Sequence, residues 1–180
     1  ILYLSVALIT LGMIFPAYLN LKNSNHLFNS SVFWFLALCA QFLSSLFFAC
    51  YGIFGPKMFT LGSTFQTLVD VMLIFLFRSL NQNVTKKFLL FPLLVLLFYY
   101  SFSNQEDYIH RTIISASTLI ILSIWQIVEL AKALKKSWSI YIIFMIVMIF
   151  IQITFGAMRL HEGIDLIPLH ETSSAPLNRF

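Results

Sequence analysis

The chain alternates between long apolar runs and short polar connections. Six runs are nearly free of charge, at residues 1–19, 31–51, 58–79, 87–103, 109–133 and 137–160. A helix needs about 20 mostly apolar residues to cross the hydrocarbon core of a bilayer, and most of these runs are of that length. The runs are continuous, whereas the strands of a membrane barrel alternate apolar and polar residues. The pattern therefore predicts an all-α fold, a polytopic bundle of six transmembrane helices in a single domain over residues 1–180.

Glycine and proline mark how the runs begin, bend and end. The stretch "YGIFGPK" (51–57) predicts a tight turn between the second and third runs. Pro16 and Pro92 lie inside runs, where proline kinks a helix. We expect Ser30 or Ser31 to cap the second helix. After residue 160 the chain becomes polar, so we expect residues 161–180 to form an extracytoplasmic tail or loop.

Composition agrees with a membrane protein. The 180 residues are 59% hydrophobic and 10% charged, against about 25% charged in soluble domains. The formal net charge of +4 does not indicate nucleic-acid binding, because the basic residues lie in the short connections between apolar runs. The lipid bilayer is the partner that the composition predicts.

The basic residues also predict an orientation. Connections that carry more Lys and Arg tend to remain in the cytoplasm. The connections after the first, third and fifth runs hold the larger set: Lys22, Arg78, Lys86, Lys87, Lys132, Lys135 and Lys136. The opposite side holds the smaller set: Lys57, Arg111, Arg159 and Arg179. We therefore expect the N-terminal end of the first run to lie outside, together with residues 161–180.

The ends of the sequence suggest a longer protein. The chain starts at Ile1, inside an apolar run, without an initiator methionine. If its C-terminal end lies outside after six spans, a seventh span is needed to return the chain to the cytoplasm.

The third run resembles a known kind of membrane segment. It reads "LGSTFQTLVDVMLIFLFRSL" (61–80). The membrane sensor regions that precede bacterial diguanylate cyclase and sensor histidine kinase domains have Leu-Gly-Asn, a leucine-rich stretch and then a basic turn. Leu61, Gly62 and Arg78 match this pattern, and Ser63 stands where Asn is common.

Further positions are similar to the same family. They are Trp34, Arg111 and "FGAMRL" (155–160). Asp70 departs from the family's all-apolar stretch. The resemblance implies a sensory input module in the bacterial inner membrane that forms a dimer. Its last span passes a signal to a cytoplasmic output domain, so any enzyme activity belongs to another part of the protein.

Asp70 is the most unusual residue of the pattern, because an acid inside a span costs about 2.5–3.5 kcal/mol and tends to face a partner or a wet cavity. Gln66 lies four residues earlier, so the two share one face of a helix, which Ser63 and Thr67 extend. The face could join neighbouring helices, bind a ligand, respond to protons, or conduct ions. A proton relay normally uses more than one deep acid, and we place only Asp70 at that depth.

Three further amides, at Gln41, Gln126 and Gln152, lie within other runs. Each could hydrogen-bond a neighbouring helix. If Gln126 and Gln152 converge on Asp70, they outline one polar ligand-binding face inside the bundle.

The rim on the predicted outer side offers charged and imidazole groups. Arg111 and Arg159 could bind an anionic ligand or a lipid headgroup, or could anchor their helices in the interface. Histidine and carboxylate side chains suit Zn²⁺, which makes His110, His161, Asp165 and His170 weak candidates as ligands. Their spacing matches no known zinc motif, so we predict no metal site.

No enzymatic motif is found in the chain. The histidines lie in connections or at the ends of runs, not at depth, so haem is not expected and we predict no cofactor. The favoured function is a sensory input domain that responds to a small ligand, a lipid state or a partner membrane protein. The alternatives are an accessory subunit of a membrane complex and, after it, a transporter or an intramembrane enzyme.

Overall fold

The computed structural model describes residues 2–22, 30–81, 84, 90–103, 108–136 and 138–174. It contains six helices: α1 (Leu2–Lys22), α2 (Ser30–Phe54), α3 (Pro56–Asn81), α4 (Leu90–Ser103), α5 (Tyr108–Lys136) and α6 (Ile140–Ser174). The described residues include no strand. The predicted all-α bundle is therefore confirmed, and five of the helices are long and apolar enough to cross a membrane.

Two helices differ from the predicted runs. Helix α4 has 14 residues, which at a rise of 1.5 Å per residue is about 21 Å, short of the roughly 30 Å of a hydrocarbon core. Helix α6 has 35 residues and continues to Ser174. Residues 161–174, which the sequence led us to expect in a tail or loop, therefore continue α6, while 175–180 lie outside the described residues.

The turn between α2 and α3 is as tight as its sequence predicts. Gly55 has a φ of 79°, a left-handed conformation that favours glycine because it has no Cβ. Its amide donates a hydrogen bond of 2.9 Å to the carbonyl of Tyr51 and so closes the end of α2. Pro56 then opens α3, where its missing N–H costs nothing.

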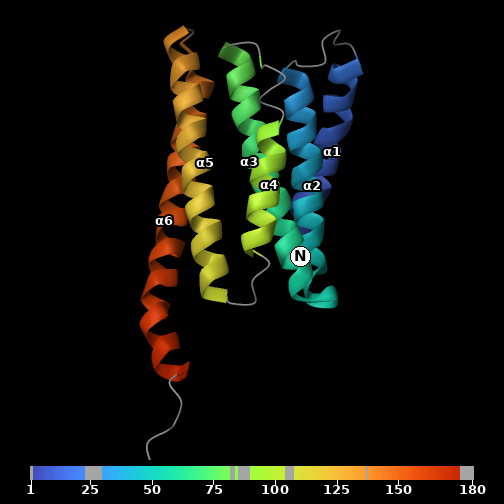
Figure 1. Cartoon of the computed structure of the whole chain (residues 1–180). Coiled ribbons are helices and arrows are strands. Elements are labelled where there is room, and N and C mark those ends of the chain that lie inside the picture. The colour runs from blue at the N-terminus through green and yellow to red at the C-terminus, as the bar shows by residue number, and fades with distance from the viewer. Residues whose placement is uncertain are drawn as a thin grey trace, which may run out of the picture.

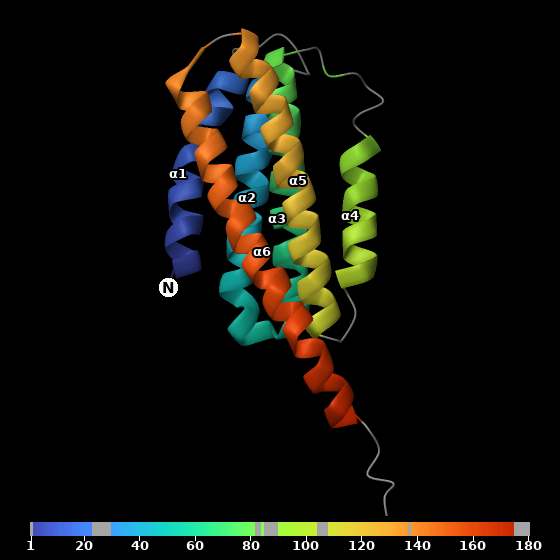
Figure 2. The same cartoon turned by 90° about the vertical axis from the view of Figure 1, so that its left-hand side faces the viewer.

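The helices run side by side along the long axis of the molecule (Figure 1). Chain neighbours α1 and α2, α2 and α3, and α5 and α6 pack together, and α3 also packs against α5. Helix α4 rests on α3 and α5, and it projects to one side of the other helices (Figure 2). The lower end of α6 extends beyond the rest of the bundle in both views. Helix α3 is therefore the centre of the arrangement, in contact with α2, α4 and α5.

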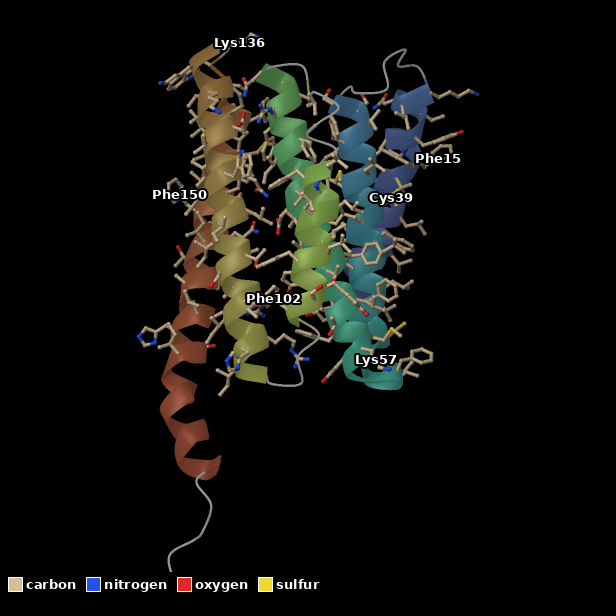
Figure 3. All side chains as sticks on the ribbon, viewed as in Figure 1. Phe15, Cys39, Lys57, Phe102, Lys136 and Phe150 are labelled. Carbon is tan, nitrogen blue, oxygen red and sulfur yellow. The ribbon has the colours of Figure 1, made fainter. Side chains whose placement is uncertain are left out.

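Large apolar side chains cover the outside of the bundle as well as its centre (Figure 3). The tightest cluster lies around α3 and includes Phe33, Val71, Ile74 and Phe75, each with an exposed fraction of 2% or less. On α6, by contrast, only 11% of the apolar segment is buried within the described part of the chain. Apolar residues exposed around a helix are typical of a helix that faces lipid, so the structure supports a membrane location for this chain.

Candidate functional site

Asp70 lies near the middle of α3 and is 3% exposed. Its helix is wedged between α2, α4 and α5, so a side chain in this position meets protein and not lipid. A buried carboxyl group is costly unless its oxygens receive hydrogen bonds. The partners of Asp70 therefore identify the first part of the site.

Two amides from two other helices meet at Asp70. The Nε2 of Gln126, on α5, donates to the Asp70 carbonyl oxygen at 3.0 Å and lies 3.4 Å from its Oδ1. The Nε2 of Gln152, on α6, donates to the same Oδ1 at 3.4 Å. Gln126 is 1% exposed, so its amide has been removed from solvent altogether. The structure thus brings Asp70, Gln126 and Gln152 into one network across α3, α5 and α6.

Gln66 shares the face of α3 as its spacing indicated, but it faces a different helix. The Ser44 hydroxyl, on α2, lies 3.3 Å from Gln66 Oε1 and donates to the carbonyl of Gly62 at 2.8 Å. Gln41 bonds Ser45 on its own helix at 3.3 Å. Gln66 therefore joins α3 to α2, while Gln41 does not take part in the network around Asp70.

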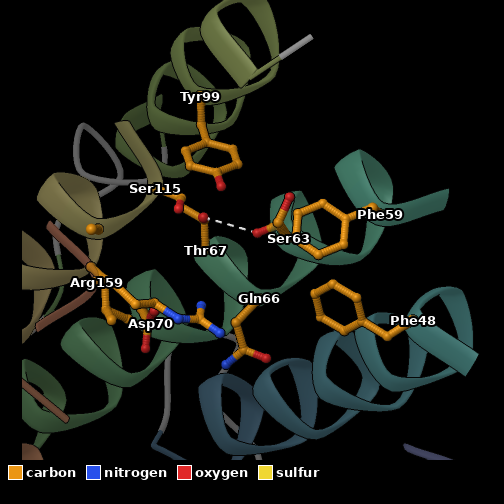
Figure 4. A pocket seen from close by; sticks show the side chains of 11 residues that line it. Phe48, Phe59, Ser63, Gln66, Thr67, Asp70, Tyr99, Ser115 and Arg159 are labelled. Carbon is orange, nitrogen blue, oxygen red and sulfur yellow. Dashed lines mark hydrogen bonds between the residues drawn. The ribbon is translucent and has the colours of Figure 1, made fainter. Parts of the chain in front are cut away.

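A cavity of about 110 Å³ opens beside the network, between α2, α3, α4, α5 and α6. Figure 4 shows the side chains around it. Its lining combines hydroxyl, amide and charged groups with aromatic and aliphatic ones: Phe48, Phe59, Ser63, Gln66, Thr67, Asp70, Tyr99, Ser115, Ala116, Leu119 and Arg159. A small cavity with a few convergent polar groups is the usual form of a ligand site.

Tyr99, on α4, caps one wall of this cavity. Its ring is 2% exposed, and its hydroxyl points toward the side chains of α3 and α5 (Figure 4). The side chains of Ser63, Thr67 and Ser115 face it across the cavity. The sequence analysis missed Tyr99 and Ser115. An apolar run that ends in "FYYSF" looks like an interfacial aromatic cluster, and nothing in it shows which tyrosine points inward.

The two rim arginines have different surroundings. Arg159, on α6, lines the cavity, and its guanidinium lies over it between Asp70 and Gln66 in Figure 4. Arg111, on α5, places its guanidinium carbon 5.3 Å from the centre of the Phe59 ring, a distance at which a cation is attracted to an aromatic face. Of the two predicted anion-binding arginines, Arg159 is the one that belongs to the cavity.

The sequence analysis did not single out a second buried acid. It lies nearer the end of the bundle that carries Lys136. Glu129, on α5, is 3% exposed and forms a 2.9 Å ion pair with Lys132. The Asn81 amide, on α3, donates to the Glu129 carbonyl oxygen at 2.8 Å. An acid followed by a lysine three residues later looks like a surface helix pair, and only the packing of α5 on α3 buries it.

The weak metal candidates are not brought together among the residues whose side chains are described. His110 and His161 lie on α5 and α6 and are exposed. Asp165 and His170 lie on the extended end of α6, and their side chains are outside the described part. Within the described part, no group of three or more His, Cys, Asp or Glu side chains could hold a metal ion. Cys39 and Cys50 are both free thiols.

Comparison with known proteins adds no assignment to this geometry. No family model, no curated protein and no solved structure matches the chain.

Proposed function

We propose that this chain is the membrane-embedded sensory input domain of a bacterial signalling receptor, located in the inner membrane with the N-terminal end of α1 outside. The observation that supports the proposal is the network around Asp70. It joins three helices in the middle of the bundle and borders a cavity that can hold a small ligand. A site of this kind couples occupancy of the cavity to the arrangement of the helices.

The helix whose link to α3 depends on Asp70 is α6. Its packing within the chain is against α5, and Gln152 links it to α3 through a single bond of 3.4 Å. A ligand shifts a conformational equilibrium only by as much as it binds one arrangement better than the other. A group that enters the cavity and competes for the Asp70 carboxyl group weakens the Gln152 bond and so favours an arrangement in which α6 has moved.

Helix α6 can also transmit such a movement to the chain beyond the bundle. It is the last of the six helices and extends beyond the others in Figure 1. In the proposed receptor, a shift of α6 moves the seventh span that we expect after it, which returns the chain to the cytoplasm, and the output domain reads this change across a dimer.

Spin labels test the proposed movement directly. Labels placed on exposed positions of α2 and α6, at Leu46 and Phe150, report the distance between these helices in lipid nanodiscs. We expect two distance populations whose ratio changes when Gln152 is replaced by Leu, because that change removes the bond to Asp70. A single population that is identical in the wild type and in Gln152→Leu would contradict a switch at this network.

The coding sequence beyond residue 180 separates the proposed function from its alternatives. A cytoplasmic kinase or cyclase domain is the expected outcome. Without an output domain, constant co-purification with other membrane subunits indicates an accessory subunit. Ion or solute flux in liposomes that is lost in Asp70→Asn indicates a transporter.

A further inference from the structure

A positively charged group lies at the mouth of the cavity. Arg159 is exposed and lines the cavity, and no ion pair or hydrogen bond is found for its guanidinium within the described part of the chain. An arginine presents several N–H donors in a planar arrangement that suits a carboxylate or a phosphate. The mouth of the cavity is therefore complementary to an anionic group.

The cavity also has an acceptor at its inner end. The side-chain bonds from Gln126 and Gln152 both end on Oδ1 of Asp70, and neither uses Oδ2. Asp70 and Arg159 line the same space without forming an ion pair with each other, since no N–O distance between them is within the 4.0 Å of a salt bridge. The inner end is complementary to a group that donates hydrogen bonds and carries positive charge.

The space between Asp70 and Arg159 is small and polar. At about 30 Å³ for each water-sized group, the volume of about 110 Å³ holds roughly four such groups. The hydroxyls of Ser63, Thr67 and Ser115, together with that of Tyr99, border this space. The hydroxyls of Ser63, Thr67 and Ser115 donate to backbone carbonyls of their own helices, so they offer a ligand their lone pairs as acceptors. A group that donates hydrogen bonds, such as an ammonium group, suits this lining.

We propose that the cavity binds a compact zwitterion, with its ammonium group at Asp70 and its anionic group at Arg159. Burying a net charge within a membrane is costly, whereas a zwitterion has no net charge, and each of its ends meets an opposite charge of the protein. This proposal names the class of ligand that the proposed receptor would bind. It depends on the proposed function only for the biological role of the ligand, because binding can be measured independently of signalling.

Two sources supply this chemistry. A free amino acid as small as glycine fits the volume. The ethanolamine headgroup of a phospholipid carries the same ammonium and an anionic phosphate. An apolar groove of about 490 Å³ between α5 and α6 shares Leu119 and Arg159 with the cavity, and Met148, Ile151 and Phe155 line it further along. An acyl chain can lie in this groove while its headgroup occupies the cavity.

The experiment measures binding to the whole protein in phosphatidylcholine nanodiscs, by thermal unfolding and by isotope-labelled glycine. Glycine is compared with acetate, which has only the anion, and with methylammonium, which has only the cation. The lipid source is tested by replacing phosphatidylcholine with phosphatidylethanolamine. Both headgroups are zwitterionic, but choline donates no N–H and is bulkier.

We expect either glycine or phosphatidylethanolamine to stabilise the wild type, and the one that does so identifies the source. Affinity should fall at least about tenfold in Asp70→Asn and in Arg159→Gln, as expected when a charge-assisted hydrogen bond is lost. Asp70→Asn retains an acceptor for both glutamine donors, and Arg159 is exposed, so both variants should fold. Gln41→Leu is the matched control, because Gln41 is a half-buried amide that does not line the cavity.

Two results would overturn the assignment. One is binding of acetate or methylammonium as tight as that of glycine, because a single charge would then be sufficient. The other is the absence of any difference between the wild type and the two cavity variants in both the glycine and the lipid arms. If the zwitterion binds but the spin-label distances between α2 and α6 do not respond, the proposed function fails and the binding site stands.

Discussion

At the scale of single residues, Asp70 can serve both as a structural contact and as part of a binding site. Its Oδ1 and carbonyl oxygen receive the two amides that hold α5 and α6 against α3. Its position on the cavity wall makes the same carboxyl group available to a ligand. Structural and binding roles are therefore not exclusive here, and they are separated by comparing the stability and the ligand affinity of the same variants.

The two glutamines of the network should contribute unequally to stability. Gln126 is buried and makes two contacts with Asp70, whereas Gln152 is half-buried and makes one at 3.4 Å. We expect Gln126→Leu to lower the free energy of unfolding by about 1–2 kcal/mol, because it leaves a buried carboxyl group short of donors. Gln152→Leu should cost about 0.6 kcal/mol, the average for an interhelical hydrogen bond in a membrane.

Unfolding in mixed detergent and SDS micelles, followed by circular dichroism, measures both effects. Gln41→Leu is the control, since its bond to Ser45 lies within one helix. Equal losses in all three variants would show that the network contributes nothing specific.

Tyr99 provides a second comparison at this scale, because the next residue is also a tyrosine. Tyr99 is 2% exposed and Tyr100 is 45% exposed. Tyr99→Phe removes a buried hydroxyl that faces Ser63, Thr67 and Ser115 across the cavity, and we expect it to lower the unfolding free energy by about 1 kcal/mol. Tyr100→Phe should change it by less than about 0.5 kcal/mol. The same unfolding assay distinguishes them, and a reversed order would mean that α4 presents its other face to the bundle.

The sequence was informative about which residue types stand out, but not about which of them meet. An acid in an apolar run is visible without a structure, and so is its helical neighbour Gln66. Whether Gln126 and Gln152 reach Asp70 depends on how α5 and α6 are rotated about their axes, and helices that are apolar on most sides leave this rotation unspecified. Tyr99 required the same information.

At the scale of helices, close approach between α2 and α3 depends on a small residue. The carbonyl of Gly62 accepts the Ser44 hydroxyl, and a Cβ added to Gly62 would lie 3.0 Å from the ring of Phe48. Tyr3 and Phe59 also pack on that ring, with centroids at 5.1 and 5.5 Å, so a shift of Phe48 disturbs two further aromatic contacts. The α2–α3 pair is thus held by a fit that one methyl group disturbs.

Replacing Gly62 by alanine should therefore destabilise the bundle by about 1–3 kcal/mol, the usual effect of overpacking. Gly12, on α1, has no atom within 4 Å of an added Cβ. Gly12→Ala should be neutral or should stabilise its helix by up to about 1 kcal/mol, because alanine favours helix more than glycine does. Thermal unfolding in nanodiscs compares the two. Equal stability of both variants would show that Phe48 can move aside.

The limits of the helices show what hydropathy can and cannot predict. The starts and ends of the first three helices agree with the apolar runs within a few residues, because a span must begin and end where lipid does. The polar stretch after residue 160 was expected to be a tail or loop, yet α6 continues to Ser174. Polar residues indicate that a segment lies outside the membrane. They do not by themselves end a helix, which can continue into water.

At the scale of the whole molecule, the helices differ in which neighbours they contact and in how much apolar surface they leave uncovered. Helices α1, α2 and α3 pack in sequence, and α5 packs on α3. Helix α6 rests on α5 and exposes most of its apolar surface. In a membrane such a surface contacts lipid or another copy of the chain, so α6 is placed to respond both to the cavity and to its surroundings.

The orientation of the bundle is the last prediction, and it follows from charge alone. Lys57 and Lys136 lie at opposite ends of the molecule (Figure 3), and the end near Lys136 carries more basic residues. The positive-inside rule therefore predicts that the Lys136 end is cytoplasmic.

Single cysteines at Ile53 and Trp138, which are 78% and 82% exposed, mark the two ends without altering any charge. The native Cys39 and Cys50 are replaced by alanine beforehand. In intact cells, a membrane-impermeant maleimide should label Ile53→Cys and leave Trp138→Cys unlabelled until the membrane is opened. Labelling of Trp138→Cys alone would invert the bundle. The mouth of the cavity would then face the cytoplasm, because Arg159, like Ile53, lies on the side predicted to be outside.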